Sequence, residues 1–259
     1  MKFFILCADD YGLNPSINDA ILELIRLKKL QATSCLVNSP NFLHAAQLLR
    51  PHLDKAQVGL HFNLTEGMPL TNLPKHHFGS LKKIIILSHL HLLNQTAIAK
   101  EFEAQLDRFI QTIGKPPDFI DGHQYIHQFP IIRSAVFSIY KKKFKQIKPY
   151  IRVPANSLLS VLSKSFTQPK QLIIAFTGAF ALRRRLKKLS IPYNKTFSGI
   201  YDFSTKQPYS VLFAKFLKEI QENGLIVCHP AKPTNDIIND LNGARIKEYL
   251  FFKNMVSMQ

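Results

Sequence analysis

The sequence contains no tryptophan, only three cysteines and no long uninterrupted apolar run. Cys7, Cys35 and Cys228 each lie within an apolar, strand-like run, and their spacing fits neither a disulfide framework nor a cysteine-based metal site. No apolar stretch reaches the ~18 residues that a transmembrane helix needs, and the N-terminus lacks the pattern of a signal peptide. These absences argue against a disulfide-rich secreted scaffold and a membrane-spanning protein, so we expect a soluble, cytoplasmic protein.

The length and composition suit one large α/β domain. The chain has 259 residues, of which 46% are hydrophobic, and barrels of about 250 residues commonly form a single domain. Buried strand-like runs alternate with amphipathic helical patterns, such as those of Ile17 to Leu27 and Glu101 to Ile113. This alternation is typical of a parallel sheet with right-handed crossovers, either open or closed. We therefore expect one domain over residues 1–259.

The formal net charge is +17, and much of the positive excess lies in three runs, at residues 82–83, 141–145 and 183–188. Such a surface favours an anionic substrate, nucleic acid or an acidic membrane. The runs lie toward the ends of helical patterns, however, where basic side chains suit the helix dipole and face water, and we prefer this interpretation. Nucleic-acid binding is disfavoured because the runs fall on separate helices and lack interleaved aromatic residues for base stacking. We expect no specific nucleic-acid partner.

The strand predicted at Phe3–Ala8 ends in two adjacent carboxylates, Asp9 and Asp10. Its unbroken apolarity is typical of a strand buried on both faces, and turn-forming residues follow at once. In parallel α/β folds, ligands and catalytic groups collect at the carboxyl ends of the strands. Neighbouring residues on an extended chain point to opposite sides, so the two carboxylates are expected to take different roles. A local role, with one of them capping the following helix, is the alternative.

Polar residues recur where other predicted strands end. His61 and Asn63 share one face of the strand predicted at Gln57–Leu64, because side chains alternate along a strand. The other strand-end residues are Asp121, His123, Arg152 and His229. One aspartate and two histidines from three strands make a ligand set that leaves positions open for water and substrate, as catalytic metal sites do. The joint placement of these residues, more than any single histidine, predicts a metal-dependent active site.

Five short motifs also occur in the order found in a known family. They are Ala8-Asp9-Asp10-Tyr11-Gly12, His61-Phe62-Asn63-Leu64-Thr65, Asp121-Gly122-His123-Gln124, Arg152 before Pro154, and His229-Pro230. Together they resemble the motifs of the YdjC-like carbohydrate deacetylases, a family that includes chitooligosaccharide deacetylase and the hopanoid-biosynthesis-associated deacetylases. The resemblance extends from Lys2 to about Lys247 and so covers nearly the whole chain.

This resemblance implies a distorted, TIM-like (β/α) barrel that hydrolyses the N-acetyl group of an amino sugar, in an oligosaccharide or a glycolipid. The residues that would hold one divalent metal ion are Asp10, His61 and His123. Asp9 would be the general base and His229 the general acid. Arg152 would hold the base carboxylate in place. Because the family also contains proteins of unknown substrate, the particular sugar is an inference from the chemistry of the site.

Four further residues near these motifs are expected to contact the substrate: Tyr11, Asn63, Tyr125 and His127. Many relatives place another histidine two residues after the second metal histidine, where this chain has Tyr125, although His127 is retained. The departure affects a contact around the metal or with the substrate and leaves the expected ligands intact. Two imidazoles and one carboxylate suit zinc or another transition ion, and magnesium also fits, so the metal is left open between Mg²⁺ and Zn²⁺.

A non-catalytic module that binds a sugar or a lipid headgroup on the same barrel is the alternative function. It would predict an incomplete site, and the intact set from Asp9 to His229 argues against it. The expected partner is an acetylated amino sugar, with an anionic or lipid-linked form left open, as are peripheral contact with a membrane surface and a homodimer. The loop at Gly67–Gly79 and the basic run at Arg183–Lys188 are expected to govern substrate choice.

Overall fold

The computed structural model describes residues 3–74, 77–156, 169–203, 207–233 and 243–255. One seven-stranded sheet, in the order β5-β4-β3-β2-β1-β7-β6, forms the centre of the fold, and every neighbouring pair of strands is parallel. The strands are β1 (Phe4–Tyr11), β2 (Ala32–Cys35), β3 (Gln57–Phe62), β4 (Phe119–Gly122), β5 (Tyr150–Ile151), β6 (Phe197–Ser198) and β7 (Gly224–Cys228). The expected parallel α/β architecture is confirmed.

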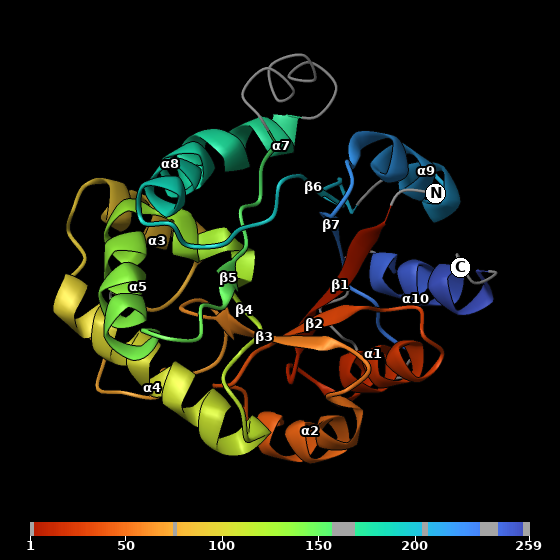
Figure 1. The fold of residues 1–259 in the computed structure, drawn as a ribbon, viewed down its shortest axis with the longest axis horizontal. Coiled ribbons are helices and arrows are strands. Elements are labelled where there is room, and N and C mark those ends of the chain that lie inside the picture. The colour runs from red at the N-terminus through yellow and green to blue at the C-terminus, as the bar shows by residue number, and fades with distance from the viewer. Residues whose placement is uncertain (1–2, 75–76, 157–168, 204–206, 234–242, 256–259) are drawn as a thin grey trace.

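Helices form a ring around the outside of the curled sheet (Figure 1). They are α1 (Pro15–Arg26), α2 (Phe42–Leu49), α3 (Leu81–His89), α4 (Gln95–Ile113), α5 (Pro130–Lys143), α7 (Pro169–Ile174), α8 (Phe180–Lys188), α9 (Tyr209–Glu219) and α10 (Ala244–Asn254). Shorter helical segments are η1 (Arg50–His52), η3 (His123–Gln128) and the π-helical η4 (Ala175–Ala179). Their apolar faces and the strands share one large buried core, as expected when amphipathic helices cover a parallel sheet.

The sheet is a half-barrel whose edge strands are β5 and β6. The chain just before β6 runs beside β5 and forms hydrogen bonds with backbone groups of β5 and of the residues that follow it. Ile151 N–H donates to Pro192 O at 2.9 Å, and the Asn194 side chain bonds both Val153 N–H and Val153 O, at 2.7 and 3.0 Å. Unpaired strand edges are otherwise prone to pair with other chains. This arrangement confirms the predicted barrel in a distorted form.

The first strand departs from regular geometry at the carboxylate pair. β1 continues through Tyr11, and its register with β2 shifts between Ala8 and Tyr11. Asp10 lies in the left-handed region, with φ of 71°, which non-glycine residues seldom adopt. Consequently the two carboxylates do not follow simple strand alternation, and both reach the same buried cluster. Neither caps the next helix, because the Asn14 side chain accepts from Ile17 N–H at 3.0 Å.

The basic runs face water, as preferred from the sequence. On α8, Leu182 and Leu186 are buried, whereas Arg184 and Arg185 are exposed. Arg183 is more confined, because its guanidinium donates to the backbone oxygens of Lys195 and Ala155. Among the helices of the described ranges, none has both the length and the apolar character required to cross a bilayer.

Candidate active site

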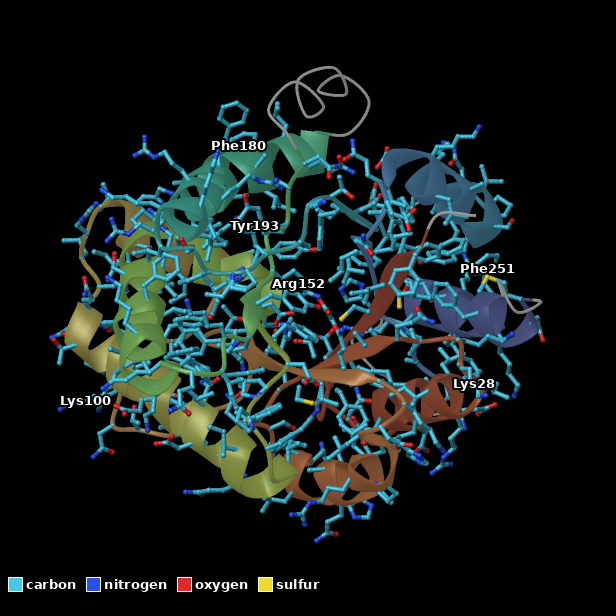
Figure 2. All side chains as sticks on the ribbon, in the orientation of Figure 1. Lys28, Lys100, Arg152, Phe180, Tyr193 and Phe251 are labelled. Atoms are coloured by element: carbon cyan, nitrogen blue, oxygen red, sulfur yellow. The ribbon has the colours of Figure 1, made fainter. Side chains whose placement is uncertain are left out.

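The carboxyl ends of the parallel strands bring the predicted residues together. The positions are Asp9 and Asp10 on β1, His61 on β3, Asp121 on β4, His123 just after β4, Arg152 just after β5 and His229 just after β7. Figure 2 places Arg152 near the middle of the ring of helices. Residues from both halves of the chain thus meet at the C-terminal end of the sheet, as the sequence predicts.

Three of these side chains have the arrangement of a metal site. Asp10 Oδ1 lies 3.0 Å from His123 Nδ1 and 3.4 Å from His61 Nε2, and the two ring nitrogens are 3.3 Å apart. Ligands about 2.0–2.2 Å from a tetrahedral zinc ion are about 3.3–3.6 Å apart. Asp10 Oδ1 is buried, and its contacts with these ring nitrogens do not have hydrogen-bond geometry. The donor types, the spacing and this buried oxygen without a well-formed hydrogen bond fit a divalent ion.

The neighbouring Asp121 fixes the orientation of His61. Asp121 Oδ1 lies 2.6 Å from His61 Nδ1 and accepts from the Ser34 hydroxyl at 2.6 Å. A metal-binding histidine commonly donates its other ring N–H to a carboxylate, which leaves the opposite nitrogen free for the metal. Asp9, His61 and Asp121 form a second group close enough to hold an ion. We favour the first group because Asp9 and Asp121 are both paired with Arg152.

The electrostatic field of the cluster favours a cation. Burial opposes protonation of His61, but the carboxylates of Asp121 and Asp9 outweigh it and raise the pKa of His61 to about 10. For Asp10, burial alone would raise the pKa, yet Arg245 and His123 hold that pKa well below its usual value. A field that attracts a proton to this position also attracts a metal ion.

Arg152 holds Asp9 in a bidentate pair. Its two terminal nitrogens donate to Asp9 Oδ1 and Oδ2 at 2.7 and 2.6 Å, and Nη2 also lies 2.7 Å from Asp121 Oδ2. The Arg152 side chain is fully buried. Burial raises the pKa of Asp9 above its usual value, although the guanidinium opposes the shift. Asp9 is thus a fixed carboxylate that is more basic than an exposed one.

His229 lies on the other side of Asp9, with Nε2 4.0 Å from Asp9 Oδ2. Burial lowers the pKa of His229 to about 3, so its imidazole is neutral near pH 7. Its Nδ1 atom is buried and has no hydrogen-bond partner within the part of the chain that the structure describes. The ring is contacted edge-on by Phe203, with 5.3 Å between ring centroids.

The four predicted substrate contacts have different surroundings. Tyr11 is fully buried and its hydroxyl donates to Ala45 O at 2.6 Å, so it faces α2 rather than the ligand cluster. Asn63 is also buried, and its Oδ1 accepts from the N–H groups of the next turn, at residues 65 and 66. His127 contacts the backbone of Arg152, with its Nε2 atom 2.7 Å from Arg152 O. Tyr125 alone among the four is partly exposed.

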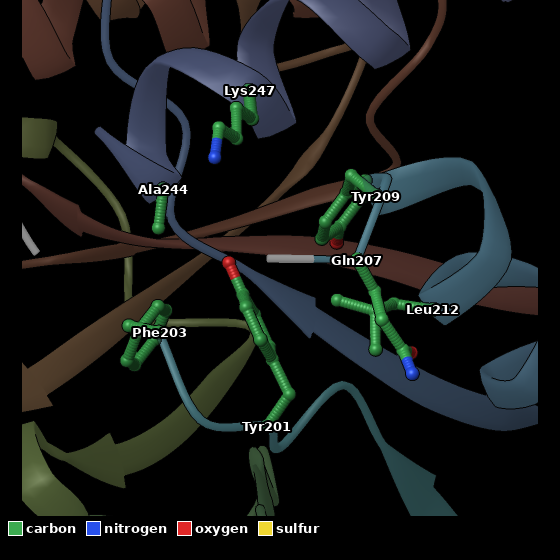
Figure 3. Close-up of a pocket in the computed structure, with 7 residues that line it drawn as sticks. All are labelled: Tyr201, Phe203, Gln207, Tyr209, Leu212, Ala244 and Lys247. Carbon is green, nitrogen blue, oxygen red and sulfur yellow. The ribbon is translucent and has the colours of Figure 1, made fainter. Parts of the chain in front are cut away.

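The structure contains a small pocket on the side of the Phe203 ring (Figure 3). Its lining residues are Tyr201, Phe203, Gln207, Tyr209, Leu212, Ala244 and Lys247. Tyr201 and Phe203 come from the segment after β6 and lie opposite the α10 residues (Figure 3). Phe203 also contacts the His229 ring, so aromatic surface lies next to the candidate acid.

Sequence reasoning missed two charged residues of the cluster, Arg245 and Glu248. Arg245 Nη2 donates to Asp10 Oδ2, and Glu248 Oε2 accepts from His229 N–H. Both side chains are buried on α10, at 7% and 0% exposure. The only sequence signal was a pair of opposite charges three residues apart on one helical face, a pattern that is common on exposed helices.

Comparisons with known proteins agree with this architecture. A chitooligosaccharide deacetylase of Proteus mirabilis is 38% identical over 148 residues, which are 56% of this chain and 57% of that protein. The enzyme of the same name from an Enterobacter species is 34% identical over 169 residues, 64% of this chain and 67% of that protein. The matches therefore span between about half and two thirds of these relatives.

A solved structure from Enterococcus faecalis, of a protein named for cellobiose-phosphate cleavage, superposes with a TM-score of 0.70. It covers 97% of this chain and 90% of that one at 19% identity, a likeness of fold alone. The model of the YdjC-like protein family matches residues 3–255. This chain therefore belongs to the YdjC-like protein family.

Proposed function

We propose that this protein is a metal-dependent hydrolase that removes the N-acetyl group from an acetylated amino sugar. The observation that carries the proposal is the convergence of Asp10, His61 and His123 beside the fixed carboxylate of Asp9. The names of the relatives, chitooligosaccharide deacetylases, supply the substrate class. The proposed domain is the whole of residues 1–259.

Asp10 Oδ1, His61 Nε2 and His123 Nδ1 would hold the divalent ion. When bound, such an ion acts as a Lewis acid that polarises the amide carbonyl, acidifies water and favours the charge that develops on the carbonyl oxygen. Asp121 keeps His61 in the required orientation, and Ser34 in turn holds Asp121. His61 lies near the end of β3 and His123 directly after β4, so the sheet positions both imidazoles.

Asp9 would accept the proton of the attacking water. Arg152 holds both of its oxygens, so the carboxylate cannot rotate away when a substrate enters. Burial raises the pKa of Asp9, which makes it a better base than an exposed carboxylate. A buried base pinned by a guanidinium is a suitable first proton acceptor.

His229 would protonate the departing amine. Its pKa is lowered to about 3 by burial, so the imidazole does not bring a proton of its own at neutral pH. Asp9 Oδ2 lies 4.0 Å from His229 Nε2 and could supply that proton once the two groups come within hydrogen-bond distance in the substrate complex. We therefore assign a relay in which the water proton passes from Asp9 to His229 and then to the amine. A weakly basic imidazole gives up such a proton readily.

An acetate-release screen tests the proposed activity. The metal-loaded protein would be assayed on chitooligosaccharides, on N-acetylated glycolipids and on anionic N-acetyl sugars, with Mg²⁺ and Zn²⁺ in separate series. We expect acetate from at least one N-acetylated sugar and none from the matching de-acetylated compound. Saturable binding of these sugars without any acetate release would instead support the non-catalytic binding module.

The basic run on α8 provides a prediction about anionic substrates. Arg184 and Arg185 are exposed and contribute to a positive surface field that attracts anions at low salt. Replacing both by Gln should raise KM for an anionic or lipid-linked sugar about two- to tenfold, with kcat unchanged. KM for a neutral oligosaccharide should not change.

The matched control for this experiment is the double replacement of Lys82 and Lys83, which are exposed on α3. It removes the same charge from another helix and should leave both KM values near those of the parent protein. Equal changes for neutral and anionic substrates would refute a role of α8 in substrate choice.

The cytoplasmic location, the membrane-surface contact and the homodimer stay predictions.

A further inference from the structure

The last helix, α10, reaches the active site with two buried charged side chains one turn apart. Arg245 is 7% exposed and Glu248 is fully buried. Residues three apart lie on the same face of a helix, so both point toward the strand ends. Burying a charged group is unfavourable unless it is paired and hydrogen-bonded. The contacts of these two residues therefore indicate which active-site groups this face of α10 holds.

Arg245 connects the metal ligand to the candidate acid. Its Nη2 donates to Asp10 Oδ2, and its Nη1 donates to His229 O at 3.4 Å. With Oδ2 engaged, Asp10 presents only Oδ1 to the two histidines. Asp10 also has a left-handed backbone, which persists only where the surroundings hold it. Arg245 is thus placed to fix which oxygen of Asp10 faces the metal position.

Glu248 holds the candidate acid through its backbone. Glu248 Oε2 accepts from His229 N–H, and Oε1 accepts from the Tyr201 hydroxyl at 2.6 Å. The His229 ring gains no hydrogen bond at Nδ1 from the described residues. The described contacts that hold it are those of its backbone N–H and O with α10 and that of its ring with Phe203.

We propose that Arg245 and Glu248 are positioning residues that set the spacing between the metal ligand Asp10 and the acid His229. Arg245 makes Asp10 a ligand through one oxygen, and Glu248 keeps His229 beside Asp9. The assignment rests on the proposed function for the roles of Asp10 and His229. Its tests separate metal binding, which needs no substrate, from turnover.

Zn²⁺ titration calorimetry tests Arg245. Arg245→Gln should weaken Zn²⁺ binding about 10- to 100-fold, the usual effect of removing a partner of a metal ligand. Arg245→Lys keeps the charge, but one ammonium group cannot make both contacts of the guanidinium, with Asp10 and with His229 O. The Zn²⁺ affinity of this variant should therefore also fall. With Co²⁺ as the bound ion, the visible absorption spectrum of both variants should change, because the ligand geometry changes.

Lys253→Gln is the matched control for Arg245. It removes a cation and an ion pair, to Glu23 at 2.9 Å, from the same helix but away from the site, and should bind Zn²⁺ like the parent. If Arg245→Lys binds Zn²⁺ with parental affinity and spectrum, Arg245 acts through charge alone and the positioning role is wrong. Arg245→Lys carries this test even if the Gln variant does not fold.

Turnover tests Glu248. Glu248→Ala should reduce kcat about 10- to 100-fold, with Zn²⁺ affinity near that of the parent. Glu248→Gln retains an oxygen that can accept from His229 N–H, so it should recover most of the lost kcat. Equal loss in both variants, or unchanged kcat in the Ala variant, would overturn the role of Glu248. A parent protein that binds Zn²⁺ but releases no acetate would contradict the proposed function and leave the Arg245 result standing.

Discussion

Replacing Asp10 by Asn is expected to abolish metal binding and acetate release together. The change keeps the size of the side chain but removes the anionic oxygen that faces His61 and His123. A neutral amide oxygen is a poor ligand in such a set, so both affinity and activity should fall by at least about 100-fold. Bound metal, measured by elemental analysis, and acetate release would be compared on the same preparation.

Asp118→Asn is a suitable control for the Asp10 variant. Asp118 precedes β4, at the opposite end of the sheet, and its carboxylate accepts from Val58 N–H at 2.7 Å. An amide oxygen can keep that bond, so metal content and activity should stay near those of the parent. Full metal content in Asp10→Asn would show that Asp10 is not a ligand, and the group of Asp9, His61 and Asp121 would then have to be considered.

Replacing Asp9 by Asn is expected to separate metal binding from turnover. Asp9 contacts Arg152 rather than the two histidine nitrogens that face Asp10. Metal content should therefore stay near one ion per chain, while kcat falls by about 10² to 10⁴, the usual range for a positioned acid or base. Loss of metal from this variant and not from Asp10→Asn would reverse the two assignments.

Stability must be measured for the Asp9 variant. The sequence suggests a carboxylate at the rim of the sheet, but Asp9 is only 2% exposed and paired with the buried Arg152. Breaking a buried pair leaves an uncompensated charge and is destabilising. Here Arg152 keeps Asp121 as a partner at 2.7 Å, and the Asn oxygen can still accept one bond. We expect a lower melting temperature with a folded protein at 25 °C, checked by circular dichroism.

The strand-end residues could be predicted because parallel strands bring their carboxyl ends to one edge. The prediction of His61, Asp121 and Arg152 required only the positions of the buried apolar runs and the direction of the chain. The substrate contact predicted for Tyr11 illustrates the limit of motif proximity. Tyr11 follows Asp10 in the motif, but the irregular end of β1 turns its hydroxyl toward Ala45 in α2.

The contribution of α10 could not be predicted from local patterns. Arg245 and Asp10 are 235 positions apart, and an amphipathic pattern does not indicate which charged side chain turns inward. The two-residue strand β6 is likewise too short to show a period. Its place at the edge of the sheet depends on pairing with β7 and on the segment before it that lies along β5. Such features depend on tertiary packing, which overrides local propensity.

Metal removal and replacement on the parent protein tests the central claim most directly. Bound divalent metal and acetate release from an N-acetylated chitooligosaccharide would be measured before chelation, after chelation and after Zn²⁺ or Mg²⁺ is returned. We predict that activity disappears with the metal and returns in proportion to the metal that rebinds. Undiminished acetate release from protein shown to be metal-free would contradict a metal-dependent mechanism at this site.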